Sequence, residues 1–347
     1  MLQSSTNIST NEHLASHSQG RIIDGLAFDW VMLVLGTIFL GGLYLDGWAH
    51  NHGRVDNSFF TVWHAFFYSG FGLVALLLVG TLLWNRSRGM NWREALPNGY
   101  QLSLLGVFVF AAGGVGDLIW HELFGIEEDF EALISPTHLM LGAGLALIVS
   151  GPLRAALARP NPRPTWREIT PALMATAGLI SAFTFFMMFE HPLHSTVAGA
   201  GQREFYSDLG QVAGVTGLMI TAALLMGPVL LLLRRWHLPP GSLTLIWGVN
   251  TGAMLIINYE RVESIWMAAA MLMAAALADW LRCKWDIGPA NFGKLHLFAF
   301  IAPALLFAAY FATLILLRGT SWSVHLVGGA IVLPGIVGWL LSHLAVE

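Results

Sequence analysis

Two short segments of this chain place an aspartate four residues before a histidine, and a second histidine follows each pair at the start of the next apolar run. The two sets are Asp46, His50 and His64, and Asp117, His121 and His138. Residues four apart share one face of a helix, about 6 Å apart along its axis. A histidine from the neighbouring helix would complete a set of two imidazoles and one carboxylate. These donors suit copper, zinc or non-haem iron.

A lone aspartate or histidine at a helix end is more often a cap or a hydrogen-bonded residue than a ligand. Two copies in matched hairpins favour the metal interpretation. Glu190 and His194 repeat the spacing a third time, although Pro192 between them would distort the helical turn. We take this pair as further candidate ligands, for a second metal. The neutral imidazoles need a partner for their second nitrogen, and Glu122, Glu128 or a backbone carbonyl could supply it.

Composition indicates a membrane protein. The 347 residues are 56% hydrophobic and only 11% charged, with a mean hydropathy of +0.64, whereas soluble domains carry about a quarter charged residues. The small net charge of −4 argues against a nucleic-acid partner. The single cysteine, Cys283, excludes an internal disulfide and a cysteine-based metal cluster. Residues 1–27 are polar and are predicted to form a mobile tail, followed by one transmembrane domain over 28–347.

Apolar runs of about 20 residues predict an all-α, polytopic bundle of about ten transmembrane helices. The runs are 28–48, 58–84, 100–121, 136–157, 170–190, 209–233, 242–259, 262–281, 295–317 and 322–343. They pair into hairpins over 28–84, 100–157, 170–233, 242–281 and 295–343. The first two hairpins read as copies, because Gly41-Gly42 precedes Asp46 much as Gly113-Gly114 precedes Asp117.

Basic residues predict the orientation of the bundle. Of the 17 Lys and Arg residues, 13 fall in the tail or in the loops that follow the second, fourth, sixth and eighth predicted spans. They are Arg21, Arg86, Arg88, Arg93, Arg154, Arg159, Arg163, Arg167, Arg234, Arg235, Arg282, Lys284 and Lys294. Both termini are therefore expected on the cytoplasmic side of a plasma membrane. The Asp/His sets then lie toward the extracytoplasmic side, next to the acidic loop segment Glu127, Glu128, Asp129 and Glu131, for which a solvated surface is the default interpretation.

Polar and soft residues within the spans have simpler explanations. Asn250 is expected to form a hydrogen bond between helices. The stripe Phe183, Phe185, Phe186, Met187 and Met188 is expected to serve packing or lipid contact, with a copper-passing methionine ladder as the minor alternative.

The Asp46, His50 and His64 arrangement resembles the metal site in the C subunit of the copper membrane monooxygenases, which oxidise methane, ammonia or short alkanes. In that family an aspartate and a histidine four apart on one transmembrane helix meet a histidine from the next helix. The likeness covers about twenty residues at each of two places in the chain. It implies copper at Asp46, His50 and His64, and likewise at Asp117, His121 and His138.

These observations favour a copper- or iron-dependent oxidoreductase acting on a small apolar substrate delivered from the lipid bilayer. A zinc-dependent membrane hydrolase would use the same donors to activate water. A protein for transport, delivery or storage of copper or zinc would also gather histidines and acids, but a conduit needs polar groups at mid-span, which are sparse. The chain could also act as a homo-oligomer or as a subunit of a larger membrane complex.

Overall fold

The computed structural model describes residues 23–55, 60–125, 127, 130–194, 208–257, 262–289 and 291–346. Within them the chain is helical, and its one β-type pairing is an isolated bridge between Gly288 and Asn291. The helices are α1 (Leu26–Asn51), α2 (Val62–Ser87), α3 (Gln101–Phe124), α4 (Glu131–Ile134), α5 (Pro136–Val149), α6 (Gly151–Leu157), α7 (Trp166–Phe186), η1 (Met188–Glu190), α8 (Asp208–Arg235), α9 (Ser242–Ile257), α10 (Val262–Lys284), α11 (Leu295–Leu317) and α12 (Val324–Val346). The all-helical prediction is confirmed for this part of the chain, and residues 1–22 of the predicted tail lie outside it.

In the described part of the chain, eight helices are long and apolar enough to cross a membrane: α1, α2, α3, α7, α8, α10, α11 and α12. The predicted span 136–157 is divided into α5 and α6, which are bent by 41° at Ser150 and count as a ninth span if taken together. The predicted span 242–259 forms α9, which has only 16 residues. The predicted count of ten is therefore not confirmed, because one span is broken and another is short.

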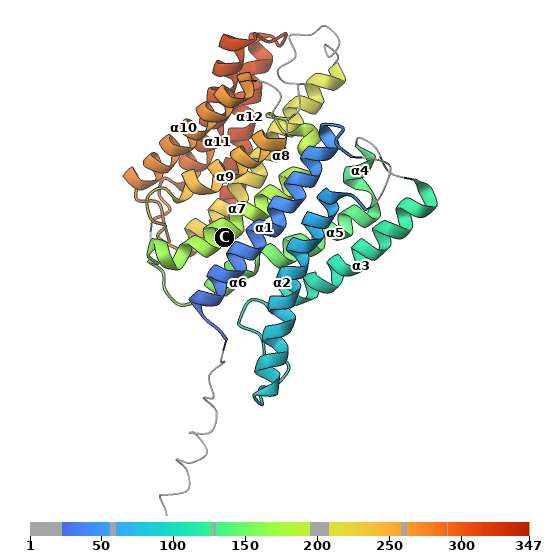
Figure 1. Cartoon of the computed structure of the whole chain (residues 1–347). Helices are drawn as coiled ribbons and strands as arrows, with labels where there is room; N and C mark the ends of the chain where they lie inside the picture. Colours follow the sequence, from blue (N-terminus) through green and yellow to red (C-terminus); the bar gives the residue numbers. More distant parts are fainter. Residues whose placement is uncertain are drawn as a thin grey trace, which may run out of the picture.

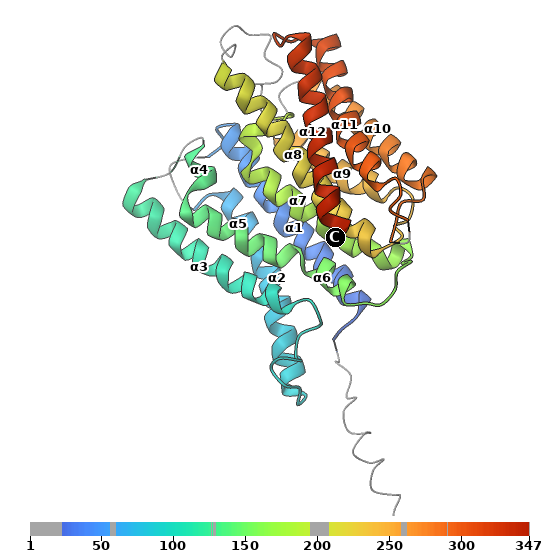
Figure 2. The ribbon, with the colours of Figure 1, turned by 180° about the vertical axis from the view of Figure 1, so that it is seen from behind.

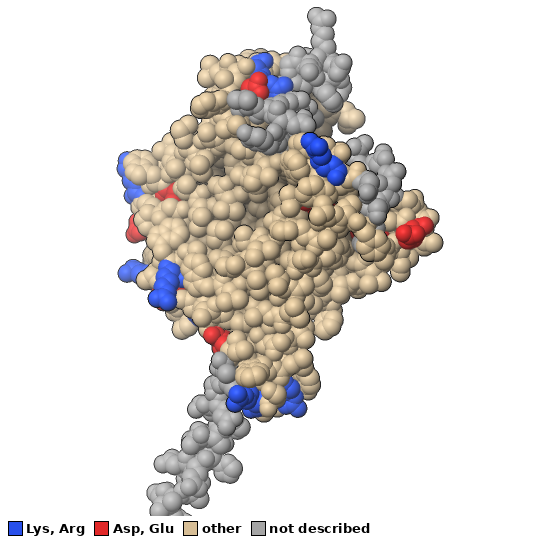
Figure 3. Space-filling model, viewed as in Figure 1, with Lys and Arg blue, Asp and Glu red and all other residues tan. Residues whose placement is uncertain are grey.

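The helices form two groups, one on either side of α7 (Figures 1 and 2). α1, α2, α3 and α5 pack as neighbours on one side, and α8, α10, α11 and α12 on the other. α7 lies between the groups and contacts α1, α5, α8 and α9. α7 is correspondingly the most buried of the eight spanning helices. The visible face of the molecule is nearly free of charged side chains across its middle, as lipid contact requires (Figure 3).

The first two hairpins pack through glycines at matching positions. A Cβ at Gly70 would sit 2.8 Å from the Phe39 Cα, and a Cβ at Gly144 would sit 2.8 Å from the Phe110 Cα. Gly70 and Gly144 each lie six residues after the histidine of their helix, and Phe39 and Phe110 each lie seven residues before the aspartate of theirs. The α1–α2 and α3–α5 hairpins therefore close by the same contact at the same offsets from the Asp/His sets.

Candidate metal centre

The first Asp/His set lies where α1 ends and α2 begins. Asp46 and His50 are in the last turns of α1, and the Asp46 Oδ2 lies 3.9 Å from the His50 Nε2. His64, in the first turn of α2, brings its Nε2 to 3.4 Å from the same oxygen. Two imidazoles from different helices thus converge on one carboxylate oxygen, as the i, i+4 spacing predicts.

The second set has the same geometry between α3 and α5. The Asp117 Oδ1 lies 3.6 Å from the His121 Nε2 and 3.4 Å from the His138 Nε2. Thr137 also donates its hydroxyl to this oxygen, at 2.9 Å. The Asp117 side chain is 2% exposed and that of His121 is 9%, whereas Asp46 and His50 are 13% and 39% exposed. Asp117 and His121 are therefore more deeply buried than Asp46 and His50, whereas His138, at 23%, is slightly more exposed than His64, at 16%.

Equivalent N-caps place the histidines of α2 and α5. The Thr61 hydroxyl accepts a hydrogen bond from the His64 backbone N–H, and the Ser135 hydroxyl accepts one from the His138 backbone N–H. Each cap starts the helix three residues before its histidine. Pro136 occupies the first turn of α5, where its missing N–H costs nothing. The caps therefore put both imidazoles in the first turn, level with the aspartates across the hairpin.

Each set offers three ligand atoms that lie within 4.8 Å of one another. The donor chemistry, two imidazole nitrogens and one carboxylate oxygen, fits a transition-metal ion with open positions for further ligands. The Asp46 Oδ1 is buried without a hydrogen-bond partner among the described residues. Because a buried carboxylate oxygen without a partner is costly, a bound cation would satisfy it. Both sets therefore fit a metal, and no third such group occurs in the described part of the chain.

The second nitrogens of the Asp117 set have partners. The His121 Nδ1 lies 3.1 Å from the Glu127 Oε2 and 3.4 Å from the Gly125 carbonyl oxygen. The His138 Nδ1 lies 2.7 Å from the Ser135 hydroxyl. The predicted backbone-carbonyl partner is thus present. Glu122 is exposed, and Glu128 lies outside the described residues.

Sequence reasoning missed the role of Glu127, which it assigned to a solvated acidic surface. The Glu127 side chain is 10% exposed, and its carboxylate reaches back to His121 across the turn after α3. Glycine at position 125, with φ of 87°, lets the chain reverse there. A glycine four residues after a helical histidine, followed by acids, is the signal that could have indicated this contact.

The side chain of Tyr68 connects the two hairpins that carry the Asp/His sets. Its ring, one turn after His64, lies 6.3 Å from the His64 ring on α2 and 5.8 Å from the Phe110 ring on α3, measured between ring centroids. The phenol of Tyr68, which belongs to α2, packs against α3, because a Cβ added at Gly114 would lie 2.9 Å from the Tyr68 Cε1. Tyr68 thus spans the gap between the two hairpins, and the two Asp/His sets form one neighbourhood.

An aromatic pair on α7 closes the inner side of this neighbourhood. A Cβ at Gly47 would sit 2.5 Å from the Phe185 ring, and a Cβ at Gly142 would sit 2.6 Å from the Phe186 ring. Gly47 adjoins Asp46 on α1, and Gly142 lies one turn after His138 on α5. The packing role predicted for the Phe/Met stripe is confirmed for these two residues, while Phe183 is 50% exposed and faces outward.

Glu190 and His194 do not join either Asp/His set. α7 ends at Phe186, and Glu190 closes the short turn η1 before the chain passes through His191 and Pro192. The pair therefore does not share a helix face, as the i, i+4 interpretation assumed, because the helix stops before it. Burial raises the pKa of the Glu190 carboxyl and lowers the pKa of His194, so both favour the neutral form.

His191 is expected to make the protein acid-sensitive. Burial lowers the pKa of this 2%-exposed imidazole from 6.5 to about 3, and its Nδ1 accepts a hydrogen bond from the Leu193 N–H. The folded state favours the neutral imidazole. The contribution of His191 to the stability of the folded protein is therefore complete above about pH 6.5 and is lost progressively as the pH falls toward 3. Between pH 7 and pH 4.5, the free energy of unfolding of the metal-free parent should fall by roughly 2–3 kcal/mol more than that of the metal-free His191→Gln variant.

Unfolding midpoints in detergent at the two pH values measure this difference. His325→Gln, at an exposed histidine of α12, is the control and should follow the parent. Equal acid loss in His191→Gln and the parent would contradict the assignment.

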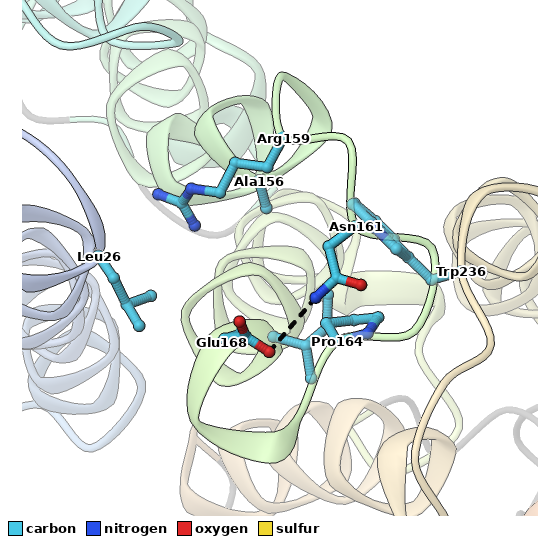
Figure 4. A pocket seen from close by; sticks show the side chains of 8 residues that line it. Leu26, Ala156, Arg159, Asn161, Pro164, Glu168 and Trp236 are labelled. Carbon is cyan, nitrogen blue, oxygen red and sulfur yellow. Dashed lines mark hydrogen bonds between the residues drawn. The ribbon is translucent and has the colours of Figure 1, made fainter.

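A cavity of about 110 Å³ lies at the opposite end of the bundle (Figure 4). Its polar lining is already paired. The Asn161 amide donates to the Glu168 Oε2 at 3.4 Å, and Arg159 forms an ion pair with the buried Asp29. Asp29 also accepts the Tyr100 hydroxyl at 2.7 Å. This cavity is therefore part of a satisfied structural network.

Comparison of the chain with protein-family models, with curated proteins and with solved structures finds no match.

Proposed function

We propose that this chain is an integral membrane metalloprotein that holds two transition-metal ions at the Asp46 and Asp117 sets and oxidises a small apolar substrate, with copper as the favoured metal and iron as the alternative. The supporting observation is the convergence, twice, of two imidazole nitrogens on one carboxylate oxygen at 3.4–3.9 Å. In this proposal the membrane is a plasma membrane, both termini are cytoplasmic, and the two sets lie at the extracytoplasmic side.

The surroundings of the sets support redox chemistry on an apolar molecule. A bound copper or iron ion would supply electron transfer and a Lewis-acidic position next to the substrate. The chain itself contributes three things. The histidines and aspartates would hold the ion. Phe185 and Phe186 exclude water on the inner side. Apolar side chains at the ends of α2 and α3 that lie near the sets are exposed. Val62 and Leu123 are each 70% exposed there, which gives an apolar molecule a path from the bilayer.

Metal delivery or storage is the second candidate, because His50 is 39% exposed and opens the Asp46 set to the outside. A through-membrane conduit is less well supported. The buried charged residues in the described part are Asp29, Asp117, Asp279 and Arg282. Asp279 and Arg282 form an ion pair with each other. Mid-bundle Asn250 is satisfied by Thr184 at 2.7 Å, as the predicted helix–helix hydrogen bond requires.

The test is elemental analysis of the detergent-purified protein beside His50→Ala/His121→Ala. We expect about one copper or iron ion per Asp/His set in the parent and loss of most metal in the double variant, since removing one of three ligands typically costs far more than tenfold in affinity. His325→Ala/His343→Ala removes two histidines outside both sets and should keep the parent's metal.

The outcomes separate the candidate functions. Copper or iron that is lost in the double variant supports the oxidoreductase, and oxygen-dependent substrate assays then follow. Zinc lost in the same way would replace the oxidoreductase with a hydrolase. Full metal retention in the double variant, or no metal in the parent after loading, would overturn the metal proposal.

A further inference from the structure

The two Asp/His sets are built alike but are anchored differently. In both hairpins the N-cap residue stands three positions before the histidine, so the positions between them can be compared directly. The residue just before the histidine is Trp63 in the first hairpin and Thr137 in the second. This single position changes what the aspartate can bind.

Thr137 completes the hydrogen bonding of its aspartate. Its hydroxyl donates to the Asp117 Oδ1 at 2.9 Å, which holds that carboxylate in place. Trp63 has only its indole N–H to donate, and gives it to the Arg54 carbonyl oxygen at 3.0 Å. The Asp46 Oδ1 is consequently buried without a hydrogen-bond partner among the described residues. One aspartate is oriented before any ion arrives and the other is not.

The histidines four residues after the aspartates, His50 and His121, differ in the same direction. In the Asp117 set the His138 Nδ1 lies 2.7 Å from the Ser135 hydroxyl, and the His121 Nδ1 lies 3.4 Å from the Gly125 carbonyl oxygen. The Glu127 Oε2 also lies 3.1 Å from the His121 Nδ1, at ion-pair distance, and neither Glu127 oxygen has a hydrogen-bond partner among the described residues. In the Asp46 set, His50 is 39% exposed, and its imidazole lies 3.9 Å from the Asp46 carboxylate, with its ring 6.0 Å from the His64 ring. A carboxylate behind an imidazole raises its basicity and fixes its tautomer.

We propose that the two centres are unequal, so that the Asp117 set retains its ion while the Asp46 set exchanges its ion with the surroundings, and that Thr137 and Glu127 are the positioning residues that create the difference. The inference rests on the proposed metal binding. Its physical basis is that ligands already oriented lose less freedom on binding, and that a buried set exposes its ion less to competing ligands. The chain then has one resident ion and one that can be delivered or replaced.

The experiment follows copper loss from Cu²⁺-loaded, detergent-purified full-length protein after a chelator such as EDTA is added. We expect two phases, each of one ion, with rates about tenfold or more apart. Asp46→Ala should remove the fast phase only, and Asp117→Ala the slow phase only. Thr137→Val, which deletes the hydroxyl and keeps the shape, should speed the slow phase about tenfold and leave the fast phase unchanged.

Additional variants separate positioning from simple loss of structure. Glu127→Gln should speed the slow phase. It should also change the Cu²⁺ paramagnetic resonance signal of the Asp117 set, which is the signal that Asp117→Ala abolishes, and leave the signal of the Asp46 set unchanged. Glu127→Asp, which keeps the charge, should restore part of the slow rate. Thr170→Val is the matched control, since the Thr170 hydroxyl only donates to the Trp166 carbonyl within α7, and both phases should stay as in the parent.

Two results would overturn the inference while leaving metal binding intact: two ions lost in one phase, or an unchanged slow phase in both Thr137→Val and Glu127→Gln. A slow phase that belongs to the Asp46 set would also overturn it. Failure of the parent to bind any copper is a different result, because it removes the proposed function together with this inference.

Discussion

On the proposed metal binding, Gly144→Leu is expected to empty the Asp117 set although it changes none of its three candidate ligands. A Cβ at Gly144 would lie 2.6 Å from the Phe110 backbone nitrogen and 2.7 Å from its Cβ. A backbone cannot rotate away as a side chain can, so α3 and α5 must separate. We expect a loss of about 3 kcal/mol, at the upper end for an overpacked core. Because Asp117 lies on α3 and His138 on α5, the separation also pulls the ligands apart.

The measurement combines the unfolding midpoint in detergent with the copper count. Gly144→Leu should lower the midpoint and lose the slowly exchanging ion, while the Asp46 centre on α1 and α2 keeps its ion. Gly80→Leu is the matched control, because a Cβ at Gly80 meets nothing within 4 Å. A Gly144→Leu protein with the parent's midpoint and both ions would show that the hairpin contact does not position the ligands.

Arg154→Met is expected to have a comparable effect on stability and no direct effect on metal. Its guanidinium donates to the Gly99 carbonyl oxygen at 2.8 Å, the Leu147 carbonyl oxygen at 2.8 Å and the Ser103 hydroxyl at 2.7 Å. These acceptors surround the break between α5 and α6, where carbonyl groups lack the helical partners that a continuous helix would give them. Removing the donor should cost roughly 3 kcal/mol, since hydrogen bonds to a charged group are the strong ones.

This variant should unfold at a lower temperature and still carry the parent's metal below that temperature, because the break lies three turns along the chain from His138. Arg163→Met, at an exposed arginine of the following loop, is the control and should leave the midpoint unchanged. If Arg154→Met unfolds like the control, the guanidinium does not support the broken span.

The contrast between α1 and α7 shows which predictions the sequence could support. The Asp46–His50 pair was predicted correctly to share a face, since an i, i+4 relation depends only on the helix being continuous there, and α1 runs on to Asn51. Glu190 and His194 have the same spacing, but α7 ends at Phe186. Pro192 indicated a distortion near this point, whereas the end of the helix depends on how the turn packs against α8 and α11. Tyr310 of α11, for example, donates its hydroxyl to the Pro192 carbonyl oxygen at 3.0 Å.

The broken span at 136–157 makes the same point for the fold. Ser150, Gly151 and Pro152 interrupt an otherwise apolar run, yet proline and glycine are often tolerated within transmembrane helices. The bend of 41° lies next to Arg154, whose acceptors come from α5 and also from α3 and the loop before it. Hydropathy counts apolar residues and contains no information on such partners, so it predicted one continuous helix.

The sequence by itself determined the helical, membrane-type architecture and the membership of the two Asp/His sets, because apolar length, helical periodicity and N-capping are local properties of the chain. Only the tertiary structure decided that Tyr68 of α2 packs against α3 and that Glu127 turns back toward His121. It also decided that Thr137 donates to Asp117, whereas Trp63 donates to the Arg54 carbonyl oxygen. Those contacts join residues on different helices and loops, and they depend on how closely the hairpins pack.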